Sequence, residues 1–238
     1  MKIILCLLAL IIFNSCKTSK SKWYEDNKNT LFKEYLINTN KINLNTSMNG
    51  KLYDDYYSDF LKYERKQKLD NNPFLKINQV YIYYSQTETQ TFGTFIDEGK
   101  QSVTFVIYSD EGRFCLSTFD LSSTFFSAPE NGIIKLIKPV SVEDFGGFEI
   151  KNDFIKTSKR NKTPFKEWYD HVNGSIKNDV IYFTEGYIGK EYKFEKKWYA
   201  VKKKFDFKEV YQPNLKTEKF KDSYGLTYFR VTGEFYVE

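Results

Sequence analysis

From residue 76 onward, apolar and polar residues alternate with a period of two, which is the spacing of a strand with one buried face. In residues 77–85, Val80 and Ile82 alternate with Tyr81 and Tyr83. Three more segments follow this pattern, separated by the turn signals DEGK and DEGR: residues 91–96, 102–109 and 114–119. Consecutive strands joined by short turns predict an antiparallel β-meander.

The alternation resumes after the turn-like segment SAPENG. The segments of this second half are a strand at residues 133–140, two hairpins at 146–158 and 165–186, and further strand-like runs at 192–203 and 224–237. Two of them contain the tripeptide Lys-Asn-Asp, whose Asn-Asp pair supplies the tight turn of a hairpin. The sequence therefore predicts a mainly β domain over residues 76–238. Its antiparallel up-and-down meander closes into a barrel or remains a strongly curved open sheet, and a sandwich also fits the pattern.

Residues 23–75 have helical spacing instead. In residues 23–39, apolar side chains recur at three- and four-residue intervals. In residues 50–69 they form one broad stripe: Leu52, Tyr53, Tyr56, Tyr57, Phe60 and Leu61. Charged residues oppose the stripe, and the segment DNNP ends the helix at Pro73. One or two N-terminal helices are expected, and the stripe is expected to pack on the sheet.

The N-terminus carries a shorter apolar run. Lys2 is followed by eleven apolar residues, from Ile3 to Phe13. A helix that spans a bilayer needs roughly 20 such residues, so this run fits the hydrophobic region of a secretory signal. The small residue Ser15 and then Cys16 follow it.

This segment resembles the lipobox of bacterial lipoproteins. Ser15 and Cys16 match that pattern, whereas Phe13 and Asn14 depart from it. The resemblance implies cleavage after Ser15 and a thioether from the Cys16 thiol to diacylglycerol. Residues 1–15 are then a signal peptide, and residues 16–22 a lipidated cysteine with a flexible tether. A plain signal peptide cut nearby and an uncleaved N-terminal anchor are the alternatives.

The same resemblance implies an address in the cell envelope. Lys17 stands where Asp favours retention in the inner membrane, so the outer membrane is expected. The absence of an acidic run after the cysteine favours its periplasmic face. The expected partner is thus a membrane, bound through acyl chains on Cys16, with an apolar small molecule or an envelope protein as a further candidate.

A second resemblance concerns the β domain. The order of strands and turns in GFEIKNDFI and WYDHVNGSIKNDVIYF resembles the lipocalin-like, up-and-down β domains of small exported lipoproteins. The Gly-x-Trp signature of true lipocalins is absent.

Composition narrows the function classes. The net charge of +5 is spread over charges of mixed sign, without the basic stripe that nucleic-acid binding requires. The 19 Tyr and 22 Phe suit a core and sheet faces. Once Cys16 is assigned to lipid, Cys115 has no disulfide partner and is expected to be a buried, inert thiol.

The candidate catalytic residues are few. His171 is the one histidine of the chain, and strand alternation predicts that it faces solvent. Glu143, Asp144 and Glu185 lie beside glycines, where two carboxylates of a glycosidase could face a ligand. The acids of DDYYSD, residues 54–59, lie on the helical pattern and lack the glycine-containing loop of a calcium site. No catalytic, cofactor or metal site is predicted.

The leading hypothesis is an exported, membrane-anchored lipoprotein with a non-catalytic binding or structural role. One alternative is a β-barrel that holds a small apolar ligand. Another is a carbohydrate-active hydrolase with paired carboxylates. A third is an inhibitor or immunity-type lipoprotein that acts on another protein through an exposed apolar patch.

Overall fold

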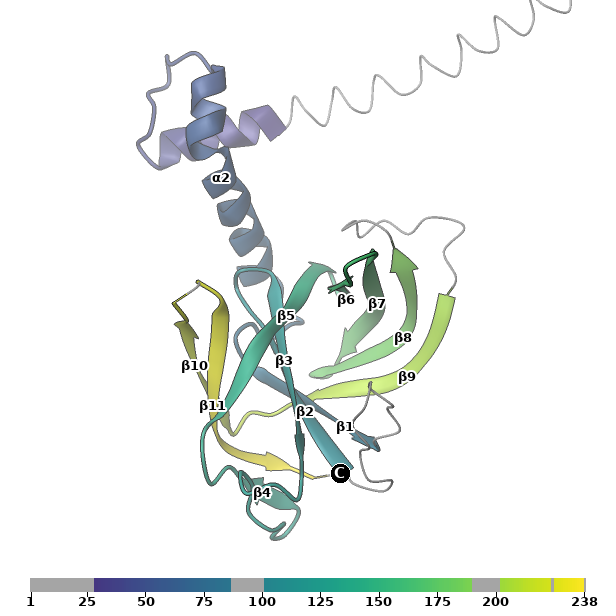
Figure 1. Cartoon of the computed structure of the whole chain (residues 1–238). Coiled ribbons are helices and arrows are strands. Elements are labelled where there is room, and N and C mark those ends of the chain that lie inside the picture. The colour runs from purple at the N-terminus through teal and green to yellow at the C-terminus, as the bar shows by residue number, and fades with distance from the viewer. Residues whose placement is uncertain (1–27, 87–100, 190–201, 224, 238) are drawn as a thin grey trace, which may run out of the picture. The chain divides into compact units, whose positions relative to one another are not determined.

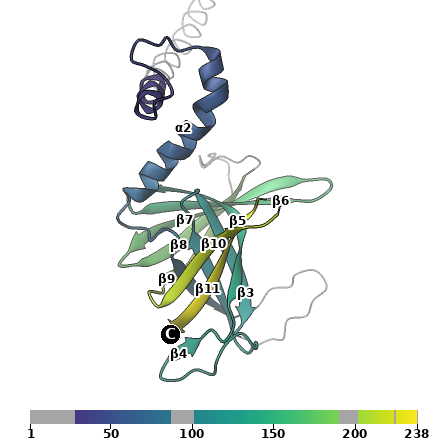
Figure 2. The ribbon, with the colours of Figure 1, turned by 90° about the vertical axis from the view of Figure 1, so that its left-hand side faces the viewer.

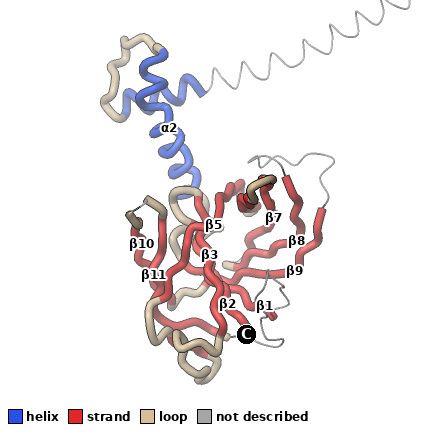
Figure 3. Tube along the Cα trace, viewed as in Figure 1, coloured by secondary structure: helices blue, strands red, loops and turns tan. Residues whose placement is uncertain are grey.

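The computed structural model describes residues 28–86, 101–189, 202–223 and 225–237. The chain divides into two units, Met1–Glu64 and Arg65–Glu238, and each is described by itself. The described part of the first unit is helical, and strands dominate the second (Figure 3).

The first unit contains two helical segments. Residues 28–38 are helical, and α2 runs over Gly50–Asp70, so that its last residues belong to the second unit. The side-chain oxygen of Asn49 accepts a hydrogen bond from the backbone N–H of Leu52 at 3.1 Å. This bond caps the first turn of α2, where backbone N–H groups have no partner within the helix.

The apolar stripe of α2 packs on the helical residues 28–38. The ring of Phe32, which is fully buried, lies 4.9 Å from the ring of Tyr53, 5.2 Å from Tyr57 and 5.3 Å from Phe60. The sequence analysis expected this stripe to pack on the sheet; the contacts that the structure gives it are with the preceding helix. The helix of residues 28–38 and the first part of α2 bury each other's apolar faces here through tilted and edge-on ring contacts.

The second unit is built from strands joined mostly by short turns (Figure 1). The strands are β1 (Val80–Gln86), β2 (Gln101–Tyr108), β3 (Arg113–Asp120), β4 (Ile133–Lys135), β5 (Val140–Lys151), β6 (Phe154–Lys162), β7 (Glu167–Lys177), β8 (Val180–Gly189), β9 (Lys202–Tyr211), β10 (Leu215–Lys221) and β11 (Thr227–Tyr236).

Eight of these strands close into a barrel. The order around the wall is β5-β3-β2-β1-β9-β8-β7-β6, and β6 pairs again with β5. All pairs in the wall are antiparallel. The prediction of an antiparallel, up-and-down, lipocalin-like domain is confirmed. Of the alternatives left open, the sheet takes the closed form.

Strand β5 divides the sheet. Its residues 140–143 pair with β11, and its residues 147–151 pair with β6. A register shift opposite Phe114 and Cys115 separates these halves, as a β-bulge does when it bends a strand. β10 and β11 therefore extend the sheet from the first half of β5 and are not part of the closed barrel wall. They lie in front of the barrel strands in Figure 2. The short strand β4 pairs with the end of β11.

The two Lys-Asn-Asp turns lie where the sequence predicts them. Lys151 pairs with Phe154, which leaves the two-residue loop Asn152–Asp153 between β5 and β6. Lys177 pairs with Val180 around Asn178–Asp179, and both loop residues have positive φ, 51° and 63°. Asn and Asp tolerate this backbone conformation better than other non-glycine residues do.

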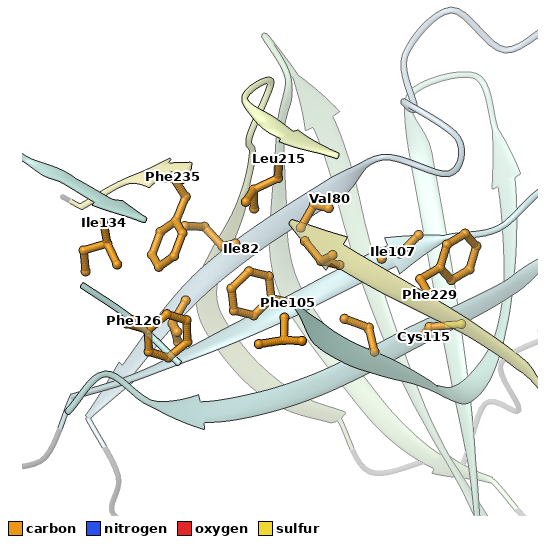
Figure 4. Packing of buried hydrophobic residues seen from close by; sticks show 14 residues of the cluster. Val80, Ile82, Phe105, Ile107, Cys115, Phe126, Ile134, Leu215, Phe229 and Phe235 are labelled. Carbon is orange, nitrogen blue, oxygen red and sulfur yellow. The ribbon is translucent and has the colours of Figure 1, made fainter. Parts of the chain in front are cut away.

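Two apolar cores lie on opposite faces of β1, β2 and β3. The interior core draws side chains from every strand of the barrel wall, and Leu69 and Leu75 join it. The outer core lies between these three strands and β11, and Phe105 is central to it (Figure 4). Because both faces are buried, seven of the eight residues of β2 are inaccessible.

The sequence analysis missed β10 and most of β9. The predicted hairpin 165–186 corresponds to β7 and β8, and β7 begins at Glu167, after Phe165. The predicted strand 91–96 and the predicted segment 192–203, except for its last two residues, lie outside the described residues.

Candidate functional site

A carboxyl group lies inside the barrel. Glu209 of β9 is 4% exposed and lies opposite Ile181 of β8. Its neighbours at alternate positions on β9, Phe207 and Tyr211, pack against the interior core, so the Glu209 side chain points inward with them. The hydroxyl of Tyr108 donates a hydrogen bond to Oε2 of Glu209 at 2.8 Å.

Burial governs the protonation of this pair. It raises the pKa of Glu209 from an ordinary value of 4.5 to about 8, and the hydrogen bond from Tyr108 lowers it by less. Burial and the nearby carboxyl together raise the pKa of Tyr108 well above its usual value. The pKa values of Tyr81 and Tyr83 are raised too, chiefly by burial. At neutral pH the Glu209 carboxyl is therefore mostly protonated and the tyrosines are neutral.

Aromatic rings pack around this carboxyl. The ring of Tyr108 lies 5.8 Å from that of Tyr81 and 5.1 Å from that of Phe148. Further along the barrel, the ring of Phe207 lies 4.8 Å from that of Phe183. These are contact distances for aromatic side chains. Side chains thus fill the described interior around Glu209. The protonated carboxyl is part of this packed core, where it is hydrogen-bonded to Tyr108.

Replacement of Tyr108 by Phe is expected to lower the free energy of unfolding by about 1–2 kcal/mol, because it removes a buried hydrogen bond to Glu209. Since that bond lowers the pKa of Glu209, its loss is expected to raise this pKa further. Urea unfolding at several pH values measures both effects. Tyr182→Phe, at an exposed tyrosine of β8, is the control, and equal behaviour of the two variants contradicts the assignment.

The structure separates the candidate glycosidase carboxylates. Asp144 accepts hydrogen bonds from the guanidinium of Arg113 at 3.1 and 3.0 Å, and Glu143 precedes it on the opposite face of β5. Glu185 lies on β8, which is three strands around the wall from β5. At a spacing of about 4.8 Å between neighbouring strands, the backbones of β5 and β8 are roughly 14 Å apart along the wall. Its carboxylate accepts a hydrogen bond from the Asn173 amide at 2.9 Å. A glycosidase needs its acids about 5–10 Å apart, so these three do not form such a pair.

The prediction that His171 faces solvent is wrong. Its side chain is on the face of β7 opposite Asp170 and Val172, as alternation predicts, but it is only 2% exposed. Its ring stacks on that of Tyr187, with the centroids 4.7 Å apart, and Tyr169 follows at 6.4 Å. Strand alternation gives the face of a residue and carries no information about what covers that face.

The other sequence candidates are structural. Cys115 is fully buried as a free thiol, so the prediction of a buried cysteine is confirmed, and burial raises its pKa to about 12. The acids of residues 54–59 lie on α2, where Asp59 pairs with Lys62 at 3.0 Å. In the described ranges, no group of three or more His, Cys, Asp or Glu side chains could hold a metal ion.

Comparison with protein-family models, curated proteins and solved structures finds no match to this chain. Among the helices of the described ranges, none is both long enough and apolar enough to cross a bilayer. Cys16 and the whole lipobox-like segment lie outside the described residues.

The sequence analysis missed Glu209. The segment KFDFKEVY places Phe205, Phe207, Glu209 and Tyr211 at alternate positions. An acid in an otherwise aromatic register is the signal that could have identified it, since a charged group at such a position must be neutralised or paired.

Proposed function

We propose that this chain is an exported lipoprotein whose acyl chains on Cys16 hold a non-catalytic β-barrel module in the cell envelope. The observation that carries the proposal is the order of the first sixteen residues: Lys2, the apolar run, Ser15 and then Cys16. The expected location is the outer membrane, with the barrel facing the periplasm. The barrel has a binding or structural role there.

The anchor needs no further apolar segment of the protein. Each buried methylene contributes about 0.8 kcal/mol, so one acyl chain holds a protein weakly and two or three make release negligible. The six residues KTSKSK after Cys16 have no apolar side chain and supply a flexible tether. Their lysines add attraction to anionic headgroups.

The packing of the barrel favours binding at its surface. Lipocalin-like barrels can hold a small ligand where the interior leaves room for it. Here aromatic rings contact one another around Glu209, and Tyr81 and Tyr108 are fully buried. A ligand at that depth would have to displace these rings. We therefore favour an envelope protein or the membrane itself over an apolar small molecule as the partner.

Metabolic labelling with radioactive palmitate tests the anchor in a bacterial host that processes lipoproteins. The wild-type chain is expected to incorporate label, and Cys16→Ala is expected to lose it. Cys6→Ala is a matched control, because it replaces another cysteine of the same N-terminal segment and is expected to keep the label.

Equal label in wild type and Cys16→Ala would remove the anchor from this account, as would a bare thiol on the native N-terminal peptide by mass spectrometry. Separation of inner and outer membranes from the labelled cells then tests the location. Label confined to the inner membrane contradicts the expectation drawn from Lys17.

A further inference from the structure

The hairpin between β6 and β7 ends in a tight turn that exposes one aromatic residue. The backbone N–H of Thr163 donates to the carbonyl of Lys166 at 2.8 Å, and the Lys166 N–H donates to Oγ1 of Thr163 at 3.0 Å. Pro164 and Phe165 occupy the two central positions, and proline suits the first of them. The Phe165 side chain is 99% exposed.

Side-chain contacts hold the arms of this hairpin together below the turn. The guanidinium of Arg160 binds the carboxylate of Glu167 through two hydrogen bonds of 3.0 and 2.8 Å. The hydroxyl of Tyr169 donates to the same carboxylate at 2.8 Å. On the other face, the amide of Asn161 donates to Asp170 at 2.7 Å. The turn is therefore positioned without any contribution from the ring of Phe165.

Folding of the barrel gives no reason for a phenylalanine at this position. Among the described large apolar side chains, Phe165 is the most exposed, ahead of Leu44 at 74%. A polar residue would close the same turn, since the hydrogen bonds involve only Thr163 and Lys166. A rigidly presented apolar ring is instead suited to contact with something outside the chain.

The surroundings of the ring indicate the chemistry of that contact. Lys162 and Lys166 flank the turn and are exposed, and the Lys166 ammonium lies 5.3 Å from the ring of Trp168. Glu167, which follows the turn, is bound to Arg160, so among the described residues of the tip the two lysines carry the excess charge. Aromatic rings beside lysines are the combination found where a protein meets the headgroups of a bilayer. An apolar pocket on a protein would accept the ring without calling for positive charge on both sides of it.

We propose that the hairpin tip Thr163–Lys166 docks on an anionic lipid surface, with Phe165 inserted among the headgroups and Lys162 and Lys166 against their phosphates. This inference rests on the proposed envelope address, because it requires that the barrel meet a membrane. The acyl chains on Cys16 would keep the protein at the bilayer, and the tip would orient the barrel on it. Attachment and docking are thus separate events.

Depth-dependent fluorescence quenching tests the docking in the full-length chain. In a background with Cys6 and Cys16 replaced by Ser, Phe165→Cys carries an environment-sensitive apolar probe. Lys177→Cys is the matched control, because Lys177 is an exposed residue at the other end of β7. Cys115 is fully buried and is not labelled in the folded protein. With Cys16 replaced, the N-terminal apolar run is expected to stay on the chain and to hold every variant on the vesicles, so that the readout reports the depth of each probe.

On phosphatidylglycerol-containing vesicles with brominated acyl chains, we expect roughly threefold stronger quenching at position 165 than at 177, since an interfacial apolar group enters the bilayer by about 5–10 Å. The double change Lys162→Glu and Lys166→Glu, and vesicles of phosphatidylcholine alone, are each expected to bring quenching at 165 down to that at 177.

Equal quenching at the two positions on the anionic vesicles overturns the docking, whatever the palmitate labelling shows. Strong quenching at 165 that survives the charge reversal also overturns it, because the lysines would then have no part in the contact. Loss of the palmitate label with quenching at 165 intact would instead remove the anchor and leave the lipid-binding tip. The two proposals can therefore fail independently.

Discussion

Replacement of Glu209 by Gln is expected to raise the free energy of unfolding at pH 7 by about 3 kcal/mol, which is a large share of the stability of a typical domain. Glutamine has nearly the shape of a protonated glutamic acid, and its side-chain oxygen can accept the hydrogen bond from Tyr108. The variant keeps the packing of the barrel interior and removes the group that has to retain a proton.

The size and sign of this effect follow from the pKa of Glu209, which burial raises to about 8. Below pH 4.5 the carboxyl is protonated in both the folded and the unfolded chain, and it contributes no pH dependence. Between pH 4.5 and 8 the unfolded chain releases the proton and the folded chain keeps it. Stability therefore falls as pH rises, by about 1.4 kcal/mol per pH unit. Above about pH 8 both states are ionised and the loss is complete.

Urea unfolding of wild type and Glu209→Gln at half-unit steps from pH 4 to pH 9 measures this difference. The two curves are expected to meet at the acid end and to diverge up to about pH 8. Other titrating groups act equally on both proteins and cancel in the difference. Glu149→Gln, at an exposed residue of β5, is the control for loss of a negative charge. Parallel curves for wild type and Glu209→Gln would contradict a buried, protonated carboxyl.

The predictable part of this fold is local in the sequence. Two-residue Asn-Asp turns at 152–153 and 178–179 lie where the Lys-Asn-Asp tripeptides occur. Period-two alternation places β1, β2 and β3, because an apolar residue at every second position is enough to define a strand. The helical stripe of residues 50–69 likewise corresponds to α2.

Closure of the barrel depends on pairs that lie far apart in the sequence. β1 pairs with β9, where Tyr81 lies opposite Tyr211, and no local pattern specifies that partner. The division of β5 between β6 and β11 is equally non-local. For the same reason the sequence analysis chose the sheet as the partner of the α2 stripe, where the structure has the preceding helix.

The candidate site residues show the same limit. Cys115 was placed correctly, because a small apolar thiol within an alternating run is a core residue under most arrangements of strands. His171 was assigned to the correct face of β7, but it was expected to be exposed and is buried. Whether other parts of the chain cover a strand face depends on the tertiary structure, which the local sequence pattern does not specify. Phe165 was counted as strand material, whereas the strand begins at Glu167 and the ring is exposed at the turn.

Replacement of Gly146 by Ala is expected to lower the free energy of unfolding by about 3 kcal/mol, at the upper end of the cost of overpacking a core. A Cβ atom at this position would overlap the backbone oxygen of Ser158 and lie 2.5 Å from Cε1 of Phe114. The oxygen belongs to β6, which pairs with β5 in the barrel wall. The methyl group can be accommodated only if β6 moves away from β5 or the Phe114 ring leaves the interior.

Gly50→Ala is the matched control for Gly146→Ala. A Cβ atom at Gly50 meets no atom within 4 Å, and alanine at the start of α2 is expected to be neutral or to stabilise by about 0.5 kcal/mol. Urea unfolding compares the two variants, and amide hydrogen exchange shows whether β6 loses protection before the rest of the barrel. In the sequence, the glycines of EDFGG suggested a place where a ligand could approach the backbone. An equal, small change in the free energy of unfolding for both substitutions would restore that interpretation. A large decrease for Gly146→Ala alone means that β6 occupies the space beside Gly146.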